Sequence, residues 1–521
     1  MIKSYLLRFF SVATPYFFCL GLLSLLSACQ EEATERSANE RPPNIVLIYV
    51  DDLGYGDLGC YGAIGVETPN VDRLAAGGLK FTDGHCSAAT CTPSRYALLT
   101  GEYAFRNNAA ILPGDAPLII DPRQPTLPRM LQKSGYATAV VGKWHLGLGD
   151  GQVDWNEAVS PGPLEIGFDY SFLIPATGDR VPTVYLEDHH VLGLDPDDSI
   201  IVSYGSPIEG VITGLSHPEQ LRVKADNQHS ATIVNGVSRI GYMSGGEAAR
   251  WTDEDFPRIL DEKAKTFMRA NQQQPFFLYY SFHDIHVPRL PHVDFQGKSK
   301  MGPRGDAIVQ MDWMVGQIMQ ELEDIGLAEE TMIIFTSDNG PVLNDGYEDL
   351  AEEKIGQHRP AGPFRGGKYS AFEAGTRVPT IVYWPGTVKA GTSNALVSQV
   401  DLMASLAELI GNPQVAHDHL DSQPMLRTWL GQQDQGRAFM IEESYTLSLR
   451  QGDWKYIRPI MRDRPNWLAA KNIEGGFEKI PQLYDLRQDP GEQENLAERI
   501  PERVQAMEQQ LQAIEQKASP Q

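Results

Sequence analysis

Four apolar runs with the same kind of ending constrain the fold of this 521-residue chain more than any other feature. The junctions are residues 44–50 before Asp51-Asp52, 136–141 before Gly142-Lys143-Trp144-His145, 275–282 before His283-Asp284-Ile285-His286, and 331–336 before Ser337-Asp338-Asn339-Gly340. Continuous apolar runs are typical of buried parallel strands. Open α/β sheets bind their ligands beyond the carboxyl ends of the strands. We therefore predict an α/β sheet with helices on its faces and one polar site at its carboxyl edge.

Changes in composition divide the chain into a large and a small folded part. Residues 44–411 carry the strand and helix patterns of the main domain, with an insertion at about 184–243 that is rich in Gly, Pro, Asp and Ser. We expect this insertion near the rim of the site. Residues 412–521 contain strand-like runs at 438–443 and 454–459 and a helical pattern within 492–517. These features predict a smaller C-terminal α+β domain.

The N-terminal segment has the pattern of an export signal. Lys3 and Arg8 precede an apolar run that stops at Cys29. Small residues before a cysteine resemble a bacterial lipoprotein signal peptide, here residues 1–28, with Cys29 as the lipidated residue. An ordinary signal peptide or a membrane helix is the alternative. The acidic segment 29–43 is predicted to be a tether, because it is polar and lacks aromatic residues.

This interpretation predicts a lipid-anchored protein of the bacterial cell envelope, held at the membrane by its lipid alone. By resemblance, Gln30 in place of an aspartate favours the outer membrane. The formal net charge of −24 argues against nucleic acid as a partner. Any anionic ligand must therefore be held by a local positive pocket.

Cys91 is predicted to lie at the start of a helix. Thr92 is a suitable N-cap, Pro93 fits the first helical position, and Gly101 fits the helix end. Free amides at a helix N-terminus favour an anion there. The alternative is a buried cysteine before a routine helix. Of the remaining cysteines, Cys60 and Cys86 offer one conceivable disulfide that no pattern supports.

Two pairs of oxygen-bearing residues predict a metal site. Asp51-Asp52 and Asp338-Asn339 each follow a predicted strand. Adjacent carboxylates at one sheet edge repel each other unless a cation holds them, and oxygen ligands select hard cations such as calcium or magnesium. Taken singly, either pair could instead belong to a turn or cap a helix. Asp57, further along the first loop, is interpreted as a turn or capping residue.

The segment Cys91-Thr92-Pro93-Ser94-Arg95, with Thr100-Gly101 after it, resembles the signature of the formylglycine-dependent sulfatases. The resemblance implies an alkaline phosphatase-like fold with a large mixed, mostly parallel sheet. It also implies that a formylglycine-generating maturation enzyme oxidises Cys91. The formylglycine hydrate would offer one hydroxyl to attack sulfur and a second to expel the covalent sulfate by elimination.

The same resemblance extends from about residue 44 to 496 and assigns further roles. It implies a calcium ion held by Asp51, Asp52, Asp338, Asn339 and the modified Cys91. Positive charge around the sulfuryl group would come from Arg95, Lys143 and, in Phe364-Arg365-Gly366-Gly367-Lys368, from Lys368. His145 would assist the elimination, and His286 would protonate the leaving oxygen as general acid. Thr177 is a weak candidate for sulfate binding, whereas His283, Glu373 and Arg377 are interpreted as structural.

These motifs predict a sulfuric ester hydrolase that acts on a sulfated carbohydrate or an aryl sulfate, with a sulfated saccharide preferred. One alternative is a phosphoester or phosphonate hydrolase of the same superfamily. Such enzymes typically carry more carboxylate and histidine ligands for transition metals. A second alternative is a non-catalytic lipoprotein that binds sulfated glycans, which the complete set of catalytic residues disfavours.

Overall fold

The computed structural model describes residues 41–412 and 421–517. The predicted signal peptide, the lipidation residue Cys29 and most of the predicted tether lie outside these residues. Residues from Pro43 onward form one compact unit. In the described part of the chain, no helix has both the length and the apolar character needed to cross a bilayer.

A ten-stranded mixed sheet forms the centre of the molecule, in the order β15-β2-β14-β13-β1-β12-β4-β5-β6-β7. Its strands are β1 (Asn44–Val50), β2 (Leu79–Phe81), β4 (Ala137–Lys143), β5 (Tyr170–Ile174), β6 (Leu186–Glu187), β7 (His190–Val191), β12 (Phe276–Ser281), β13 (Thr331–Ser337), β14 (Thr380–Tyr383) and β15 (Gly391–Ser393). The central block β13-β1-β12-β4-β5 is parallel. Four of these five strands are the four apolar runs, so the predicted mostly parallel sheet is confirmed.

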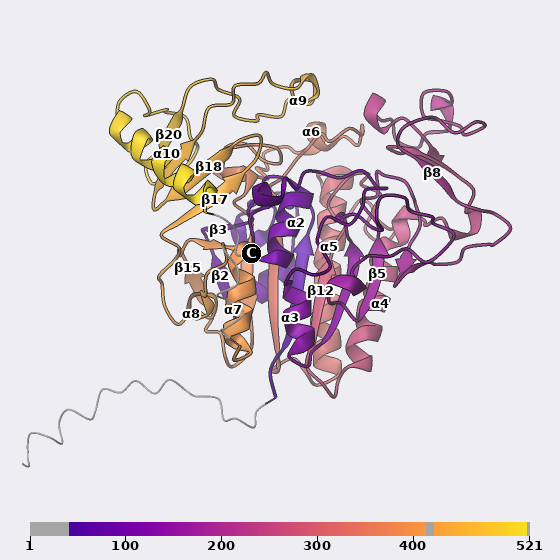
Figure 1. Cartoon of the computed structure of the whole chain (residues 1–521), viewed down its shortest axis with the longest axis horizontal. Helices are drawn as coiled ribbons and strands as arrows, with labels where there is room; N and C mark the ends of the chain where they lie inside the picture. The colour runs from indigo at the N-terminus through magenta and orange to yellow at the C-terminus, as the bar shows by residue number, and fades with distance from the viewer. Residues whose placement is uncertain (1–40, 413–420, 518–521) are drawn as a thin grey trace, which may run out of the picture. The chain divides into compact units, whose positions relative to one another are not determined.

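Helices cover both faces of this sheet (Figure 1). Alternate residues of β1 face opposite cores, because side chains alternate along a strand. Ile45, Leu47 and Tyr49 pack with α2 (Cys91–Thr100), α3 (Leu127–Lys133), α7 (Leu402–Leu409) and α8 (Leu426–Trp429). Val46, Ile48 and Val50 pack with α1 (Pro69–Gly77), α4 (Phe256–Ala270) and α5 (Gly302–Asp324). Each helix therefore buries one apolar face on the sheet.

The C-terminal part has its own antiparallel sheet, β17-β18-β19-β20. Its strands are Phe439–Glu443, Leu447–Gln451, Trp454–Ile457 and Gln482–Asp485, and α10 (Pro501–Glu515) packs against them. Figure 1 shows this group in orange to yellow. The second sheet starts well after residue 412, the predicted boundary, because α8 first returns to the core of the main sheet. The short helix α9 (Asn466–Ala470) connects β19 to β20.

The predicted insertion, residues 184–243, is not separate from the main sheet, since β6 and β7 extend the sheet edge. The insertion also contains short paired strands. They are β8 (Ile201–Ser203) with β11 (Tyr242–Ser244), and β9 (Ile233–Val234) with β10 (Val237–Ser238). Elsewhere β3 (Gly84–His85) pairs with β16 (Val397–Ser398), and α6 (Ala351–Lys354) follows the β13 loop. Cys60 and Cys86 do not pair, because both thiols are free.

Candidate active site

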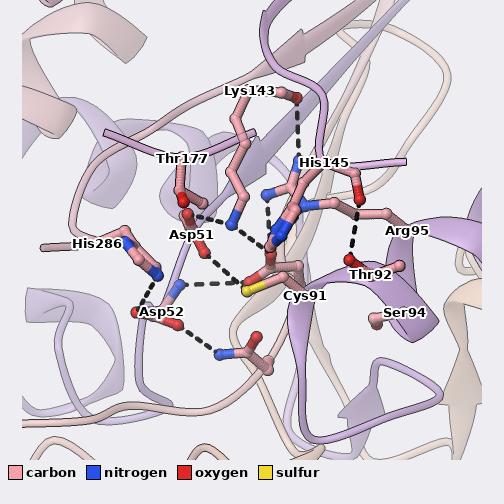
Figure 2. A network of polar contacts seen from close by, with 12 residues as sticks. Asp51, Asp52, Cys91, Thr92, Ser94, Arg95, Lys143, His145, Thr177 and His286 are labelled. Carbon is pink, nitrogen blue, oxygen red and sulfur yellow. Dashed lines mark hydrogen bonds and ion pairs between the residues drawn. The ribbon is translucent and has the colours of Figure 1, made fainter. Parts of the chain in front are cut away.

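The carboxyl ends of neighbouring strands converge on one polar cluster (Figure 2). Asp51 and Asp52 follow β1, Lys143 ends β4, His286 follows β12, and Asp338 follows β13. All five side chains are buried. The parallel register of these strands therefore brings together residues that lie far apart in the sequence.

Cys91 is the first residue of α2 and is only 2% exposed. Its thiol donates to Asp51 Oδ1 over 3.6 Å. Burial raises the pKa of the Cys91 thiol, although Lys143 and Lys368 act in the opposite direction. The sulfur marks the position that the reactive oxygens of an oxidised side chain would take. The helix N-terminus adds the favourable end of the helix dipole at this point.

The start of α2 differs from the prediction by two residues. Thr90, rather than Thr92, holds the N-cap position. The Thr92 hydroxyl instead donates to the carbonyl oxygen of His145 over 2.9 Å, which ties the helix to the end of β4. The predicted helix end at Gly101 is confirmed, since this residue has a φ of 71° and terminates the helix.

The carboxylates of Asp51, Asp52 and Asp338 and the Cys91 sulfur place ligand atoms within 4.8 Å of one another. Burial raises the pKa values of Asp51 and Asp52, and neighbouring carboxylates add to this effect. Asn339 Nδ2 donates to Asp52 Oδ1 over 2.8 Å. Among the described residues, Asn339 Oδ1 is buried without a hydrogen-bond partner. A hard divalent cation fits this set of oxygens, because it would offset the repulsion and engage the unpaired oxygen.

Three cations surround the carboxylates. Arg95 donates through Nε and Nη2 to Asp338 Oδ2 over 2.9 and 2.8 Å. Lys143 Nζ lies 2.5 Å from Asp51 Oδ2, and Lys368 Nζ lies 2.9 Å from Asp52 Oδ2.

These cations also affect the titration of Asp338. Burial alone would raise its pKa, but Arg95 and Lys143 outweigh burial and lower it. The site therefore keeps Asp338 ionised and concentrates positive charge in a strongly acidic protein.

The two predicted catalytic histidines present different ring nitrogens to the site. His145 Nε2 lies 3.0 Å from the carbonyl oxygen of Leu112, so this nitrogen carries the proton and donates it. His145 Nδ1 is then an acceptor, and it is buried without a partner in the described part of the chain.

In His286 the other ring nitrogen is bonded to the backbone. Its Nδ1 donates to the carbonyl oxygen of Val287 over 2.7 Å, and its Nε2 faces Asp52 Oδ2 at 3.9 Å. Burial, with Lys368 adding to it, lowers the pKa of His286 well below its ordinary value, while Asp179 opposes this shift. His283 is engaged elsewhere, because its Nε2 accepts from the Gly178 amide over 2.9 Å.

Residues 43–412 match the sequence model of the family described as Sulfatase. The chain belongs to the sulfatase family. An N-acetylgalactosamine-6-O-sulfatase of Bacteroides thetaiotaomicron is 47% identical over 497 residues, which cover 94% of this chain and 97% of that protein. Human arylsulfatase A is 34% identical over 495 residues, covering 90% and 87% of the two chains. The protein is thus a sulfuric ester hydrolase.

Solved structures agree with this family. A sulfatase structure from work on glycosaminoglycan metabolism by Bacteroides thetaiotaomicron matches with a TM-score of 0.90 and 48% identity, covering 92% of this chain and 100% of that one. A phosphonate monoester hydrolase of Agrobacterium radiobacter has a TM-score of 0.56 and 17% identity, covering 91% of this chain and 95% of that one. This second likeness extends to the fold alone.

Some residues next to the active site of this sulfatase escaped the sequence patterns. Asp345 Oδ2 lies 2.8 Å from Lys368 Nζ, so Asp345 and Asp52 share this ammonium. Ser281 Oγ accepts from Arg95 Nη1 over 2.5 Å. Ser281 ends β12 and could have been found from its place at a strand end. Asp345 lies in an irregular loop that gives no periodic signal.

Thr177 is buried, and its hydroxyl is already engaged. It is hydrogen bonded to Asp179 and accepts from Arg180 Nη1 over 2.6 Å. Any contact of Thr177 with sulfate would require these bonds to rearrange.

Asp57 forms the expected turn, since its Oδ2 accepts from the Gly54 amide over 2.7 Å. It is also paired with the buried Arg304. This ion pair anchors the loop after β1 to helix α5.

Proposed function

We propose that this sulfatase removes sulfate from a sulfated saccharide, with the 6-O-sulfate of an N-acetylgalactosamine unit as the first candidate. The observation that carries the proposal is the buried group of Asp51, Asp52, Cys91 and Asp338 surrounded by cations. The choice of sugar is supported by the 47% identity to a protein named N-acetylgalactosamine-6-O-sulfatase.

Cys91 is proposed to be oxidised to formylglycine by a formylglycine-generating enzyme. The aldehyde hydrate would supply one hydroxyl for attack on sulfur and one for later release of sulfate. Asp51 Oδ1, which accepts from the Cys91 thiol, would orient the group at this position. We assign the uptake of its protons to two residues. Asp338 is kept ionised by Arg95, and His145 Nδ1 is an unpaired acceptor.

Calcium is the proposed metal, held by Asp51, Asp52, Asp338 and Asn339. When bound, it would supply positive charge that polarises the sulfate ester. Lys143 contacts Asp51 and Lys368 contacts Asp52, and the two ammonium groups would bind the sulfuryl oxygens. Fixed positive charge around a reacting anion is usually the largest catalytic contribution.

Added calcium should raise the melting temperature of wild-type protein after chelator treatment. Binding adds RT ln(1 + [L]/Kd) to the free energy of unfolding, about 2.7 kcal/mol at 100 times Kd. Asp52→Ala should lose both this stabilisation and activity. Calorimetry with and without calcium measures the effect. A calcium-independent melting temperature, with zinc raising it instead, would contradict the calcium assignment.

His286 is proposed to protonate the leaving sugar oxygen through Nε2. Its Nδ1 is fixed by the Val287 carbonyl, so Nε2 is the nitrogen that faces the site. The bound sulfate ester brings negative charge close to this ring, which favours its protonated form. A sugar alkoxide is a poor leaving group and needs this proton.

The deciding experiment measures inorganic sulfate released from N-acetylgalactosamine 6-sulfate and from its 4-sulfate isomer. The protein is produced with a maturation enzyme, and mass spectrometry confirms formylglycine at position 91. We expect turnover of the 6-sulfate, little turnover of the 4-sulfate, and none of either by Cys91→Ala. Fully modified protein that releases no sulfate from any 6-sulfated sugar would reject the 6-O-sulfate as its substrate, and a lack of turnover of every sulfated sugar would reject the substrate class.

We also propose that the protein is a lipoprotein of the bacterial cell envelope, anchored through Cys29 at the outer membrane. The small residues before Cys29 and the acidic segment after it support this placement. Cys29→Ser should move the protein out of the membrane fraction or leave its signal uncleaved. Unchanged fractionation together with an unlipidated N-terminus would contradict lipid anchoring.

A further inference from the structure

A cavity lies beside the active site, where three segments that are far apart in the sequence meet. Its volume is about 390 Å³, in the range of small-ligand sites. It is lined by the insertion at Ala225 and Asp226, by the loop from Leu343 through helix α6, and by Trp467 and Lys471 in and after helix α9. Figure 1 shows α6 and α9 at the same end of the molecule. The C-terminal part thus forms one wall of this cavity.

Lys471 connects the cavity to the reaction centre. Its side chain is buried, and its Nζ lies 2.9 Å from Asp226 Oδ2 and 4.0 Å from Asp345 Oδ1. The other oxygen of Asp345 holds Lys368, the proposed sulfate-binding lysine. One carboxylate therefore separates the cavity wall from the group that would hold the sulfate. A ligand that extends from the reaction centre by one sugar unit would reach this space.

Trp467 gives the cavity an aromatic wall. It is 36% exposed, and its ring packs edge-on with Tyr369, with centroids 4.9 Å apart. Tyr369 directly follows Lys368, so the indole is anchored close to the reaction centre. Asn344 places an amide on the same cavity. A pyranose has apolar C–H faces that pack on an aromatic ring and hydroxyls that bond to amides and carboxylates, so both kinds of contact suit it.

The charge of the lining restricts which sugar fits. Lys471 is the one cationic residue among the described residues that line the cavity, whereas five of the lining residues carry carboxylates. These are Asp226, Glu348, Asp349, Glu352 and Glu353. Asp226 is paired with Lys471, and Asp349 is paired with Arg289. Glu352 and Glu353 are exposed. An anionic sugar would be repelled here, because like charges at short range are unfavourable.

We infer that this cavity is a subsite for an uncharged sugar unit attached to the sulfated sugar, with Trp467 as its platform. The inference rests on the proposed function, because it needs a sulfated saccharide at the reaction centre. It adds a preference for a neutral neighbour over a uronic acid or a second sulfated sugar.

The test compares three substrates. They are a sulfated monosaccharide, the same sugar linked to a neutral hexose, and the same sugar linked to a hexuronic acid. For wild type, kcat/KM should be about three- to tenfold higher for the neutral disaccharide than for the monosaccharide, as expected for one aromatic contact. In Trp467→Ala this ratio should fall to about one, mainly through KM. Trp454→Ala, a partly buried tryptophan on β19, is the matched control and should keep the wild-type ratio.

A second variant tests the charge argument without altering the platform. In Glu352→Gln/Glu353→Gln, kcat/KM for the uronic acid-linked substrate should rise relative to the neutral disaccharide. Equal kcat/KM for all three substrates in wild type, or an unchanged ratio in Trp467→Ala, would overturn the subsite and leave the proposed function standing. Failure of fully modified enzyme to release sulfate from any of them would instead reject the proposed function.

Discussion

Asp52 is approached by both His286 and Lys368, yet the two residues would act on different parts of a sulfate ester. If His286 is the general acid, its loss should matter most for a poor leaving group. His286→Ala should lower kcat/KM for a sugar sulfate by about 10²- to 10⁴-fold, and far less for an aryl sulfate with an acidic phenol. Lys143→Ala and Lys368→Ala should impair both substrates to a similar degree, because both esters carry the same sulfuryl group.

Equal losses for His286→Ala on the two substrates would remove its role as acid. His283 offers no ready substitute, because its Nε2 is held by the Gly178 amide. Kinetics of the three variants on the two substrates suffice for this comparison.

Asp284 should make stability depend on pH. Burial raises its pKa to about 6, and the hydrogen bond from Gln310 only partly opposes this. The folded protein therefore holds the proton more tightly than the unfolded chain, whose Asp pKa is about 3.9. Wild-type stability should fall relative to Asp284→Asn as the pH rises from about 4 to about 6, by about 2 to 3 kcal/mol in total. Denaturant unfolding in saturating calcium measures the difference, and a pH-independent difference would show that Asp284 is ionised throughout.

For single residues, the sequence predicts the position of a functional side chain where that residue directly follows a strand. At these positions a continuous apolar run gives way abruptly to polar residues, which marks the strand end. The residues placed in this way are Asp51, Asp52, Lys143, Asp338 and Asn339. Asp345 could not be found, since the fold alone brings its irregular loop to Lys368. The hydrogen bonds of Thr177 to Asp179 and Arg180 were equally out of reach, because they depend on how one loop folds back on itself.

Among the elements, β4 depends on a glycine close to its end. Gly142 has a φ of 114°, and a Cβ there would lie 1.8 Å from the carbonyl oxygen of Ser281 in β12. Gly142→Ala should therefore force β4 from β12, displace Lys143, and reduce both stability and activity severely. Gly135→Ala is the control, because Gly135 also has a positive φ, of 86°, but open space around it. The free energy of unfolding of Gly135→Ala should fall by only about 1 to 2 kcal/mol. Equal melting temperatures for the two variants would contradict the steric argument.

The elements themselves were predicted best where they are long. The run at 44–50 matches β1 residue for residue, and the other three runs match β4, β12 and β13 to within two residues. Strands of two or three residues such as β6 and β7 gave no signal, because so short a segment shows no period. The sequence does not predict that helix α8 belongs to the main core. Its Trp429 packs on Phe81, which lies far away in the sequence, and no local pattern reveals such a contact.

For the whole molecule, the C-terminal part helps to shape the active site. Arg365, three residues before Lys368, donates through Nη1 to the carbonyl oxygen of Glu492 over 2.6 Å. The amide of Glu373, at the other end of the same loop, donates to Glu492 Oε2 over 2.7 Å. The loop that carries Lys368 is thus held at both ends by one residue that follows β20.

Glu492→Ala should consequently lower kcat/KM about equally for sugar and aryl sulfates, because it releases the Glu373 end of the loop that carries Lys368, the proposed sulfate-binding lysine. The loss of a buried hydrogen bond should also cost about 1 to 3 kcal/mol of stability. Glu508→Ala is the control, because Glu508 pairs with Arg458 within the C-terminal part and does not contact the loop. Similar activity losses in both variants would indicate general destabilisation rather than loop positioning.

The burial of Cys91 sets a time limit on the proposed oxidation. At 2% exposure within the first turn of α2, its sulfur is out of reach of another protein's catalytic residues. The modifying enzyme must therefore meet this segment on a newly made chain, before α2 packs against the sheet. Oxidation and folding then compete for the same chain, and molecules that fold first keep a thiol. When synthesis outruns the supply of modifying enzyme, a preparation should contain correctly folded but permanently inactive molecules, and its specific activity should report the history of its production.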